Sequence, residues 1–150
     1  MVQVVDGKNC VMHLDYIVNE TRLTKVSLST IYKEFKNVNG SSLQIPLTIP
    51  PNKWTVVCIN IAMLLEGNKI FLSSQNQAFY LRSFQICSTV NVRGVYTSDI
   101  AYQVHSLHKD MQFKIPKDQD WFSQYNWVQY PCEESGDPGL DEPKQEEIKA

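Results

Sequence analysis

Apolar and polar residues alternate near the start of the chain, a pattern typical of half-buried β-strands. Within residues 10–16, four residues on one face are apolar and two on the other face are polar: Cys10, Met12, Leu14 and Tyr16 against His13 and Asp15. The polar stretch at residues 19–21 interrupts this run, and residues 24–29 resume it with Val26 and Leu28 facing inward. Together the two runs predict a β-hairpin.

The pattern then changes its period. Residues 31–36 lose the alternation and predict a short helical turn, which the turn dipeptide Asn39-Gly40 closes. Residues 43–47 predict another strand, and because Pro46 has no N–H to donate, it must lie at an edge or a bulge. Residues 54–61 are rich in β-favouring residues and apolar on both faces, which predicts a central strand buried on both sides.

The second half predicts one short helix and further strands. Strong helix formers occupy residues 62–66, with Asn60 as the N-cap and Gly67 as the terminator. Four segments favour strands: residues 79–88, 90–97, 111–115 and 127–130. Thr89 is expected at a tight bend between the first two, and Gly94 at a bulge. Seven or eight short strands with little helix predict an all-β fold, an antiparallel β-sandwich that is jelly-roll-like and has short helical turns.

Charge divides the chain into two unlike parts. Its 150 residues are 43% hydrophobic and 20% charged, the composition of a single globular domain. The formal net charge of −2 combines residues 1–131, with 12 basic and 9 acidic groups, and residues 132–150, with two basic and seven acidic groups. All 16 aromatic residues lie in the first part. We therefore expect a β-sandwich domain over residues 1–131 and a disordered acidic tail over residues 132–150.

Targeting signals and cysteine usage give no sign of secretion. The amino terminus lacks a basic region followed by an apolar run, and the sequence has no stretch of about 20 apolar residues to cross a bilayer. The four cysteines are spaced 48, 29 and 45 residues apart, which matches neither a zinc pair nor a compact disulfide scaffold. We expect a cytoplasmic protein in which Cys10, Cys58 and Cys87 are small buried thiols.

Candidate catalytic groups are sparse. The motif His105-x-x-His108 resembles part of a zinc site, but the polar segment around it favours surface histidines. Pairing of His13 with Cys58 or Cys87 is conceivable, although strand interiors disfavour a thiolate. The sequence contains no Gly-x-Ser-x-Gly elbow and no glycine-rich phosphate loop. We expect neither an enzyme nor a bound metal or cofactor.

Five aromatic residues gather near the end of the domain: Trp121, Phe122, Tyr125, Trp127 and Tyr130. One interpretation is that these rings close the core and anchor the last strand. The other is a flat platform on which sugars stack, which makes a carbohydrate-binding-like β-sandwich the alternative function. Neither a nucleic acid nor a membrane is expected as a partner.

Six basic residues are the second candidate contact feature: Lys33, Lys36, Arg82, Arg93, Lys114 and Lys117. On its predicted strand, Arg82 shares a face with Phe84 and Ile86, which allows a partly buried structural role. The six residues are either scattered surface charges or a positive face that recruits an acidic polymer.

Several segments occur in the order and spacing of a known family. Three of them carry the resemblance: residues 54–65, 81–87 and 92–99. Others add to it: residues 13–15, residues 31–36 before 43–47, and residues 111–116 before the aromatic ending. From about residue 11 to residue 131, the chain resembles the cilia- and flagella-associated protein twenty domain family, and in particular its members that carry WD repeats.

The resemblance implies a non-enzymatic β-sandwich that binds microtubules, with tubulin and other ciliary or centriolar proteins as partners. In this family the domain lies at the inner junction of axonemal doublets or on the inner wall of centriolar triplets, which implies the cytoskeleton of the cilium axoneme, centriole or basal body. Lys33, Lys36 and Arg93 occupy positions where the family pattern is similar. Family members begin their domain well before residue 10, and WD repeats follow it in some of them. We therefore expect a fragment or short form whose sandwich lacks its first strands.

Overall fold

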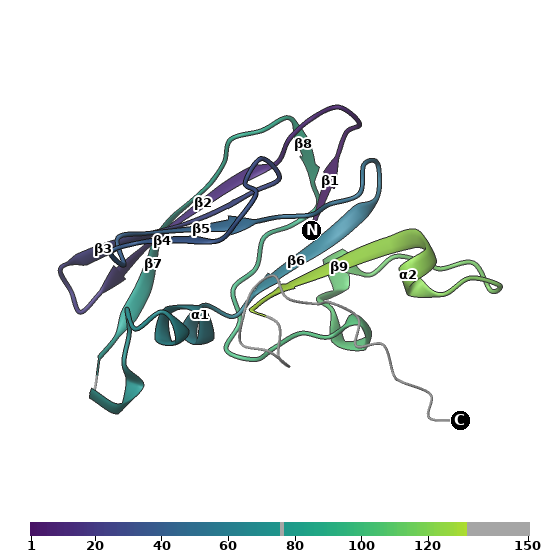
Figure 1. Ribbon diagram of the computed structural model, residues 1–150. Coiled ribbons are helices and arrows are strands. Elements are labelled where there is room, and N and C mark those ends of the chain that lie inside the picture. Colours follow the sequence, from purple (N-terminus) through teal and green to yellow (C-terminus); the bar gives the residue numbers. More distant parts are fainter. Residues whose placement is uncertain (76, 132–150) are drawn as a thin grey trace, which may run out of the picture.

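Two β-sheets pack against each other in the computed structural model, which describes residues 1–75 and 77–131 (Figure 1). The four-stranded sheet has the order β8-β1-β6-β9 and consists of β1 (Val2–Val4), β6 (Trp54–Ile59), β8 (Val90–Val92) and β9 (Tyr125–Tyr130). The five-stranded sheet has the order β4-β5-β3-β2-β7 and consists of β2 (Val11–Val18), β3 (Arg22–Ser29), β4 (Lys36–Val38), β5 (Ser42–Pro46) and β7 (Phe79–Ile86). The predicted all-β sandwich is confirmed, and the acidic segment 132–150 lies outside the described residues.

The predicted hairpin is formed by β2 and β3, which pair antiparallel along all eight residues of each strand. Asn19 and Glu20 adopt left-handed backbone angles, with φ of 52° and 66°, and reverse the chain in a tight turn. Because successive residues of a strand face opposite sides of the sheet, Leu14, Val26 and Leu28 point into the core while their neighbours along the strand face outward.

Two strand pairs are parallel, so the sheets are mixed rather than purely antiparallel. β4 forms an antiparallel hairpin with β5 across the Asn39-Gly40 turn. β5 pairs on its other side with β3, and this pairing is parallel. β9 runs parallel to β6, from which it is remote in sequence, so no hairpin constrains their relative direction. Pro46 is the last residue of β5 and lies beyond the residues that pair with β4. At this local edge no hydrogen bond to β4 is lost through its missing N–H.

Two local predictions are wrong because contacts remote in sequence override the local pattern. Residues 31–36 form no helical turn: the chain is irregular up to Phe35, which packs on the core, and Lys36 opens β4. The strand predicted over residues 90–97 ends at Val92. Gly94 lies beyond it rather than in a bulge, and its carbonyl accepts a hydrogen bond from the Met1 amino group at 2.8 Å.

Residues 111–115 do not form the predicted strand, and one strand, β1, was not predicted. Met111 ends the short 3₁₀ helix η3 (Lys109–Met111) and is buried against the four-stranded sheet. β1 has three residues, too few to display a period, yet it pairs with both β6 and β8. The domain therefore has an amino-terminal strand ahead of residue 10, where none was expected.

The main core lies between the sheets, and α1 (Ile61–Gly67) closes one of its ends. Leu64 and Leu65 of this helix are fully buried with core residues from both sheets. Asn60 caps the helix as predicted, because its side-chain oxygen accepts a hydrogen bond from the Met63 N–H at 3.1 Å. A 3₁₀ turn, η1 (Ser73–Gln75), leads on towards β7. None of the helices in the described part of the chain is long and apolar enough to span a lipid bilayer.

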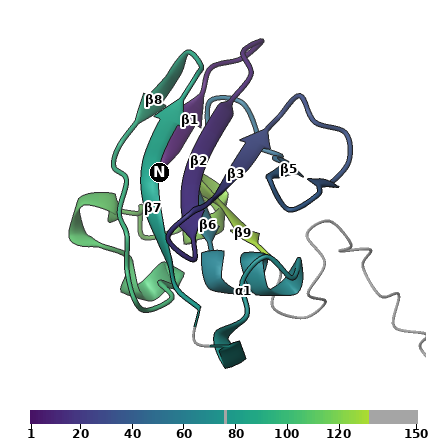
Figure 2. The same cartoon turned by 90° about the vertical axis from the view of Figure 1, so that its left-hand side faces the viewer.

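The outer face of the four-stranded sheet is covered by residues 94–124, which include η2 (Val104–Ser106), η3 and α2 (Trp121–Gln124). A second apolar cluster fills the space between cover and sheet: Met1, Val56, Leu107 and Met111, with Trp54, Phe113, Trp121, Tyr125 and Trp127 packed around them. The four-stranded sheet thus has both faces covered. Figure 2 looks onto the outer face of the five-stranded sheet, and no described helix and no strand of the other sheet lies over it.

Tyr16 gives the core a measurable pH dependence. Its ring is buried against Phe79, with ring centroids 6.0 Å apart, and burial raises the pKa of Tyr16 to about 12. In the unfolded chain the phenol ionises near pH 10, so between about pH 10 and 12 the unfolded state loses a proton that the folded state keeps. The free energy of unfolding, relative to that of Tyr16→Phe, should be constant below about pH 9 and fall by roughly 1.4 kcal/mol per pH unit above about pH 10.

Urea unfolding of the two proteins at four values between about pH 8 and 12 measures this difference. All other ionisable groups are common to both proteins, so their contributions cancel in the difference. Parallel stability curves for the two proteins would contradict the assignment.

Candidate interaction surface

The outward side chains of the five-stranded sheet form rows, because residues that pair across neighbouring strands point to the same side. Two mostly polar rows cross the sheet from β4 to β7: Val38, Ser42, Lys25, Asp15 and Ser83, and beside them Lys36, Gln44, Ser27, His13 and Gln85. A third row on β3, β2 and β7 is apolar: Leu23, Ile17 and Tyr80. We call the surface formed by these three rows the open face.

Short polar contacts order the central part of the open face. His13 Nδ1 lies 2.7 Å from Ser27 Oγ, and the Ser83 hydroxyl donates to Oδ2 of Asp15 at 2.9 Å. The Lys25 ammonium lies 3.8 Å from Oδ1 of Asp15, which is shielded from water and has no hydrogen-bond donor among the described residues. The open face thus compensates its central carboxylate with its own residues.

The apolar row crosses the open face near the β2–β3 turn. Ile17 is buried between its two neighbours, whereas Leu23 is 43% exposed and Tyr80 is 57% exposed. Contiguous exposed apolar side chains beside a polar surface are typical of contact sites. The sequence alone does not reveal this row. The alternation of residues 10–16 already places Ile17 on the outer side, but its neighbours follow only from the register of β3 and β7.

Three of the six predicted basic residues lie at the two edges of this sheet. Lys33 precedes β4 and is exposed, and Lys36 opens β4 and pairs with Glu34 at 3.6 Å. Arg82 is exposed on β7, at the opposite edge. With strands about 4.8 Å apart, the two edges are separated by about 19 Å. These cations therefore border the open face rather than form one compact cluster.

A β-bulge moves Arg82 off the face of Phe84 and Ile86, on which simple alternation places it. Asp15 pairs with Ser83, whereas the next residue, Tyr16, pairs with Leu81, so the register of β7 on β2 shifts by one residue. Arg82 is the extra residue of this β-bulge, and the alternation along β7 changes phase there. It consequently lies outside the inward face of β7 and is exposed, not partly buried in the core.

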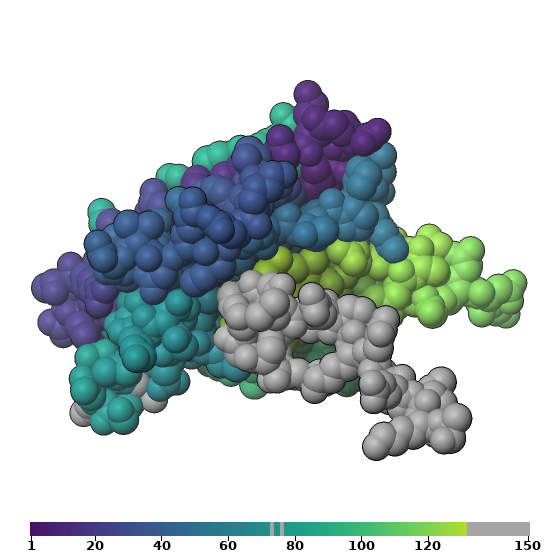
Figure 3. Space-filling view, in the orientation of Figure 1, coloured from purple at the N-terminus to yellow at the C-terminus, as the bar shows by residue number. Residues whose placement is uncertain are grey.

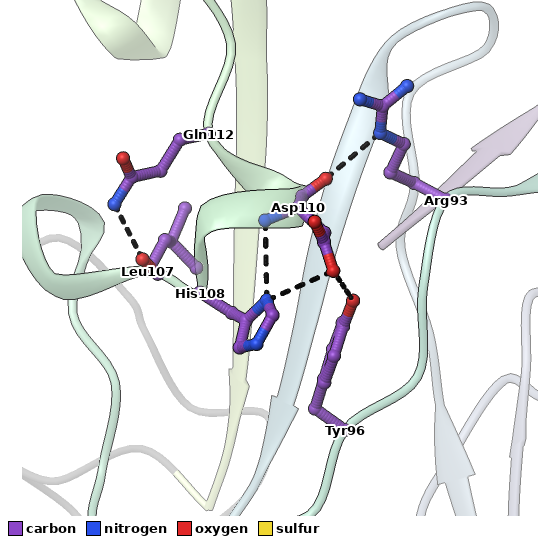
Figure 4. A network of polar contacts seen from close by, with 6 residues as sticks. All are labelled: Arg93, Tyr96, Leu107, His108, Asp110 and Gln112. Atoms are coloured by element: carbon purple, nitrogen blue, oxygen red, sulfur yellow. Dashed lines mark hydrogen bonds and ion pairs between the residues drawn. The ribbon is translucent and has the colours of Figure 1, made fainter.

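Arg93 makes its contacts within the protein. Its Nε donates to the carbonyl oxygen of Asp110 at 2.9 Å, and its guanidinium lies 4.6 Å from the centre of the Phe113 ring. The Asp110 carboxylate accepts a hydrogen bond from the Tyr96 hydroxyl at 2.8 Å and lies 3.5 Å from Nδ1 of His108 (Figure 4). The hydrogen bond to Asp110 raises the pKa of Tyr96. This network fastens the chain that follows β8 to the covering segment.

The charges are unevenly distributed between the two sides of the domain. Lys114 and Lys117 are exposed on the covering segment, away from the open face. The covering residues 94–124 carry three basic and four acidic groups, a net charge of −1. Residues 11–46 and 79–86, which build the five-stranded sheet, carry five basic and three acidic groups. Most of the +3 charge of residues 1–131 therefore belongs to the sheet with the open face.

The aromatic ending does not present a flat, exposed platform. The Trp121 ring meets the rings of Phe122, Tyr125 and Trp127 at interplanar angles of 79°, 45° and 65°. Tyr130 is separate from them and lies buried in the main core. Because sugar stacking needs an open ring face, these tilted and mostly half-buried rings suit the structural interpretation, in which they hold the cover on the four-stranded sheet.

The histidines, cysteines and carboxylates form no metal site among the described residues. In residues 1–75 and 77–131, no three side chains of histidine, cysteine, aspartate or glutamate gather as a metal site requires. His13 lies in the five-stranded sheet and Cys58 in the four-stranded sheet. Cys10 is buried, and burial raises the pKa of its thiol. Cys87 is exposed, contrary to the prediction of a buried thiol.

Comparison with known proteins identifies a family whose domain matches most of the described residues. The CFA20 domain matches residues 1–115, a range that includes β1. WD repeat-containing protein 90 of Homo sapiens is 26% identical over 148 residues, covering 85% of this chain and 8% of that protein, and its Mus musculus counterpart is 25% identical over 157 residues, covering 86% and 8%. Centriole proteome protein 16 of Chlamydomonas reinhardtii is 24% identical over 141 residues, covering 93% and 6%.

The chain therefore spans less than a tenth of the length of these curated relatives. No solved structure matches it.

The contacts of Arg93 predict a stability effect that separates a structural residue from a binding residue. Arg93→Lys keeps the positive charge but loses the planar guanidinium that bonds Asp110 and covers Phe113. We expect the free energy of unfolding to fall by about 1 kcal/mol. Urea unfolding measures this loss, and Lys114→Gln is the control because Lys114 is exposed on the same segment. Equal stability of both variants and wild type would remove the structural role.

Proposed function

Because the chain belongs to the CFA20 domain family, we propose that it is a non-enzymatic structural module that binds microtubules in cilia or centrioles. The name of centriole proteome protein 16 supports the centriolar setting. The observation that carries the microtubule assignment is the charge of the folded residues: 1–131 have a net charge of +3, concentrated on a sheet whose outer face is uncovered. A positive, uncovered protein face suits an acidic polymer.

The family resemblance supports a more specific setting. We propose tubulin and other ciliary or centriolar proteins as partners, and the inner junction of axonemal doublets or the inner wall of centriolar triplets as the location. In either place the domain acts by contact between its surface and the polymer. No step of this function needs a nucleophile, a metal or a cofactor.

Electrostatic attraction of this kind depends on salt. The Debye length is about 14 Å at 50 mM and about 8 Å at 150 mM ionic strength, so exposed charges are screened more strongly at the higher value. The purified chain should co-sediment with taxol-stabilised microtubules at about 50 mM salt and bind several-fold more weakly at about 150 mM. Circular dichroism establishes that the sample is folded. A folded protein that stays in the supernatant at both salt concentrations would falsify the proposed function.

The acidic segment 132–150 should weaken this binding. It carries seven acidic and two basic groups, a net charge of −5, and therefore opposes attraction to an acidic polymer. Deleting residues 132–150 should strengthen co-sedimentation by about two- to fivefold, the scale of one or a few surface charge contacts. The thermal transition should stay unchanged, because residues 1–131 hold the apolar clusters. Unchanged or weaker binding by the shortened chain would show that the segment does not weaken microtubule binding by charge repulsion.

A further inference from the structure

We propose that the open face of the five-stranded sheet, rather than the covered side of the domain, docks on the acidic protein wall of the microtubule. The assignment rests on the proposed function and adds the surface and the residues that make the contact. Apolar exposure, charge and size each support it.

Two large apolar side chains stay in water on the open face although the rest of its rows is mostly polar. Leu23 and Tyr80 lie on either side of the buried Ile17, so together they make one apolar row across three strands. Hydration of such a row is unfavourable, and contact with a partner recovers that free energy. Tyrosine is enriched at protein interfaces because it joins a large apolar ring to a hydroxyl that forms hydrogen bonds. Tyr80 therefore qualifies as the anchor of the contact.

The uncompensated charges of this sheet are mainly positive. Asp15 and Glu34 are paired with lysines of the same sheet, whereas no ion pair among the described residues involves Lys33 or Arg82. The remaining carboxylate, Glu20, lies in the β2–β3 turn. The sheet thus offers a free cation at each edge, about 19 Å apart, with the rows between them.

Charge also decides which partner fits. A second copy of the chain would bring a sheet of the same charge, +2 over residues 11–46 and 79–86, against this sheet, and like charges repel. The covering segment on the other side of the domain has a net charge of −1 and offers an acidic polymer no net attraction. Of these two sides of the domain, only the open face attracts an acidic wall.

The open face has the size of a protein interface. Eight residues of β2 and β3 span about 26 Å, and five strands span about 20 Å, an extent that suits the roughly 800 Å² that each partner buries in a standard complex.

Matched charge reversals on the two sides test the assignment. Lys33→Glu with Arg82→Glu changes the edges of the open face, and Lys114→Glu with Lys117→Glu makes the same change in net charge on the covering segment. Microtubule co-sedimentation at about 50 mM salt should weaken at least about tenfold for the first pair and less than about threefold for the second. All four residues are exposed, and thermal transitions establish that each variant is folded.

A matched pair of aromatic truncations provides a test that is independent of charge. Tyr80 is 57% exposed on the open face, and Phe122 is 58% exposed on α2 of the covered side. In Figures 1 and 3 the β2–β3 turn and α2 lie at opposite ends of the molecule. Tyr80→Ala should weaken binding at least about fivefold, whereas Phe122→Ala should leave it within about twofold of wild type.

The outcomes separate this assignment from the proposed function. If the wild type binds and only Lys114→Glu with Lys117→Glu or Phe122→Ala reduces binding, the contact is on the covered side and the open face is excluded, although microtubule binding stands. Equal losses for both charge pairs, with no loss for Tyr80→Ala, also overturn the assignment. A wild-type dimer in sedimentation velocity that Tyr80→Ala dissociates would make the face a contact between copies instead. If the folded wild type does not bind at all, the proposed function and the assignment fail together.

Discussion

The pairing of β2 with two strands at once determines which side chains of the five-stranded sheet face the core and which face outward. β2 pairs with β3 along its whole length and with β7 on its other side. A slip of one residue would turn His13 and Asp15 into the core and expose Leu14 and Tyr16. Burying the carboxylate without its Ser83 and Lys25 contacts is costly, and so is exposing the apolar residues, so both penalties enforce the same register. The register of β2 therefore determines both the core and the open face.

The hydrophobic period of the sequence was sufficient to predict elements whose contacts lie close together along the chain. The β2–β3 hairpin and the helix capped by Asn60 were predicted from the sequence, because alternation and capping chemistry act over a few residues. Lys36 opens a strand only because β5 is available to pair with it, and no pattern within residues 31–36 indicates that. The bulge at Arg82 likewise depends on the register of β7 against β2, so the exposed position of this residue and the apolar row next to it could not be predicted from β7 alone.

The outward residues of each sheet explain why one sheet carries a cover and the other does not. On β6 and β9, Trp54, Val56 and Trp127 point outward and demand burial, which Leu107 and Met111 of the irregular covering segment provide. On β2 and β3 the corresponding outward positions are mostly polar and satisfy one another, so water solvates them well. The apolar residues on both faces of 54–61 had already predicted that this strand is covered on both sides. The covering residues could not be predicted, because their segment has no regular period.

Arg82 contributes to the edge and to the face of the same sheet. β7 is an eight-residue edge strand, and an edge of that length invites pairing with another chain. The bulge interrupts its regular ladder and places a charged side chain there, which opposes such pairing. The edge strands β4 and β8 have three residues each and offer short templates. With these edges protected, contact through side chains of the open face is favoured over strand addition at β4, β7 or β8, and the cation that protects the edge also borders the face.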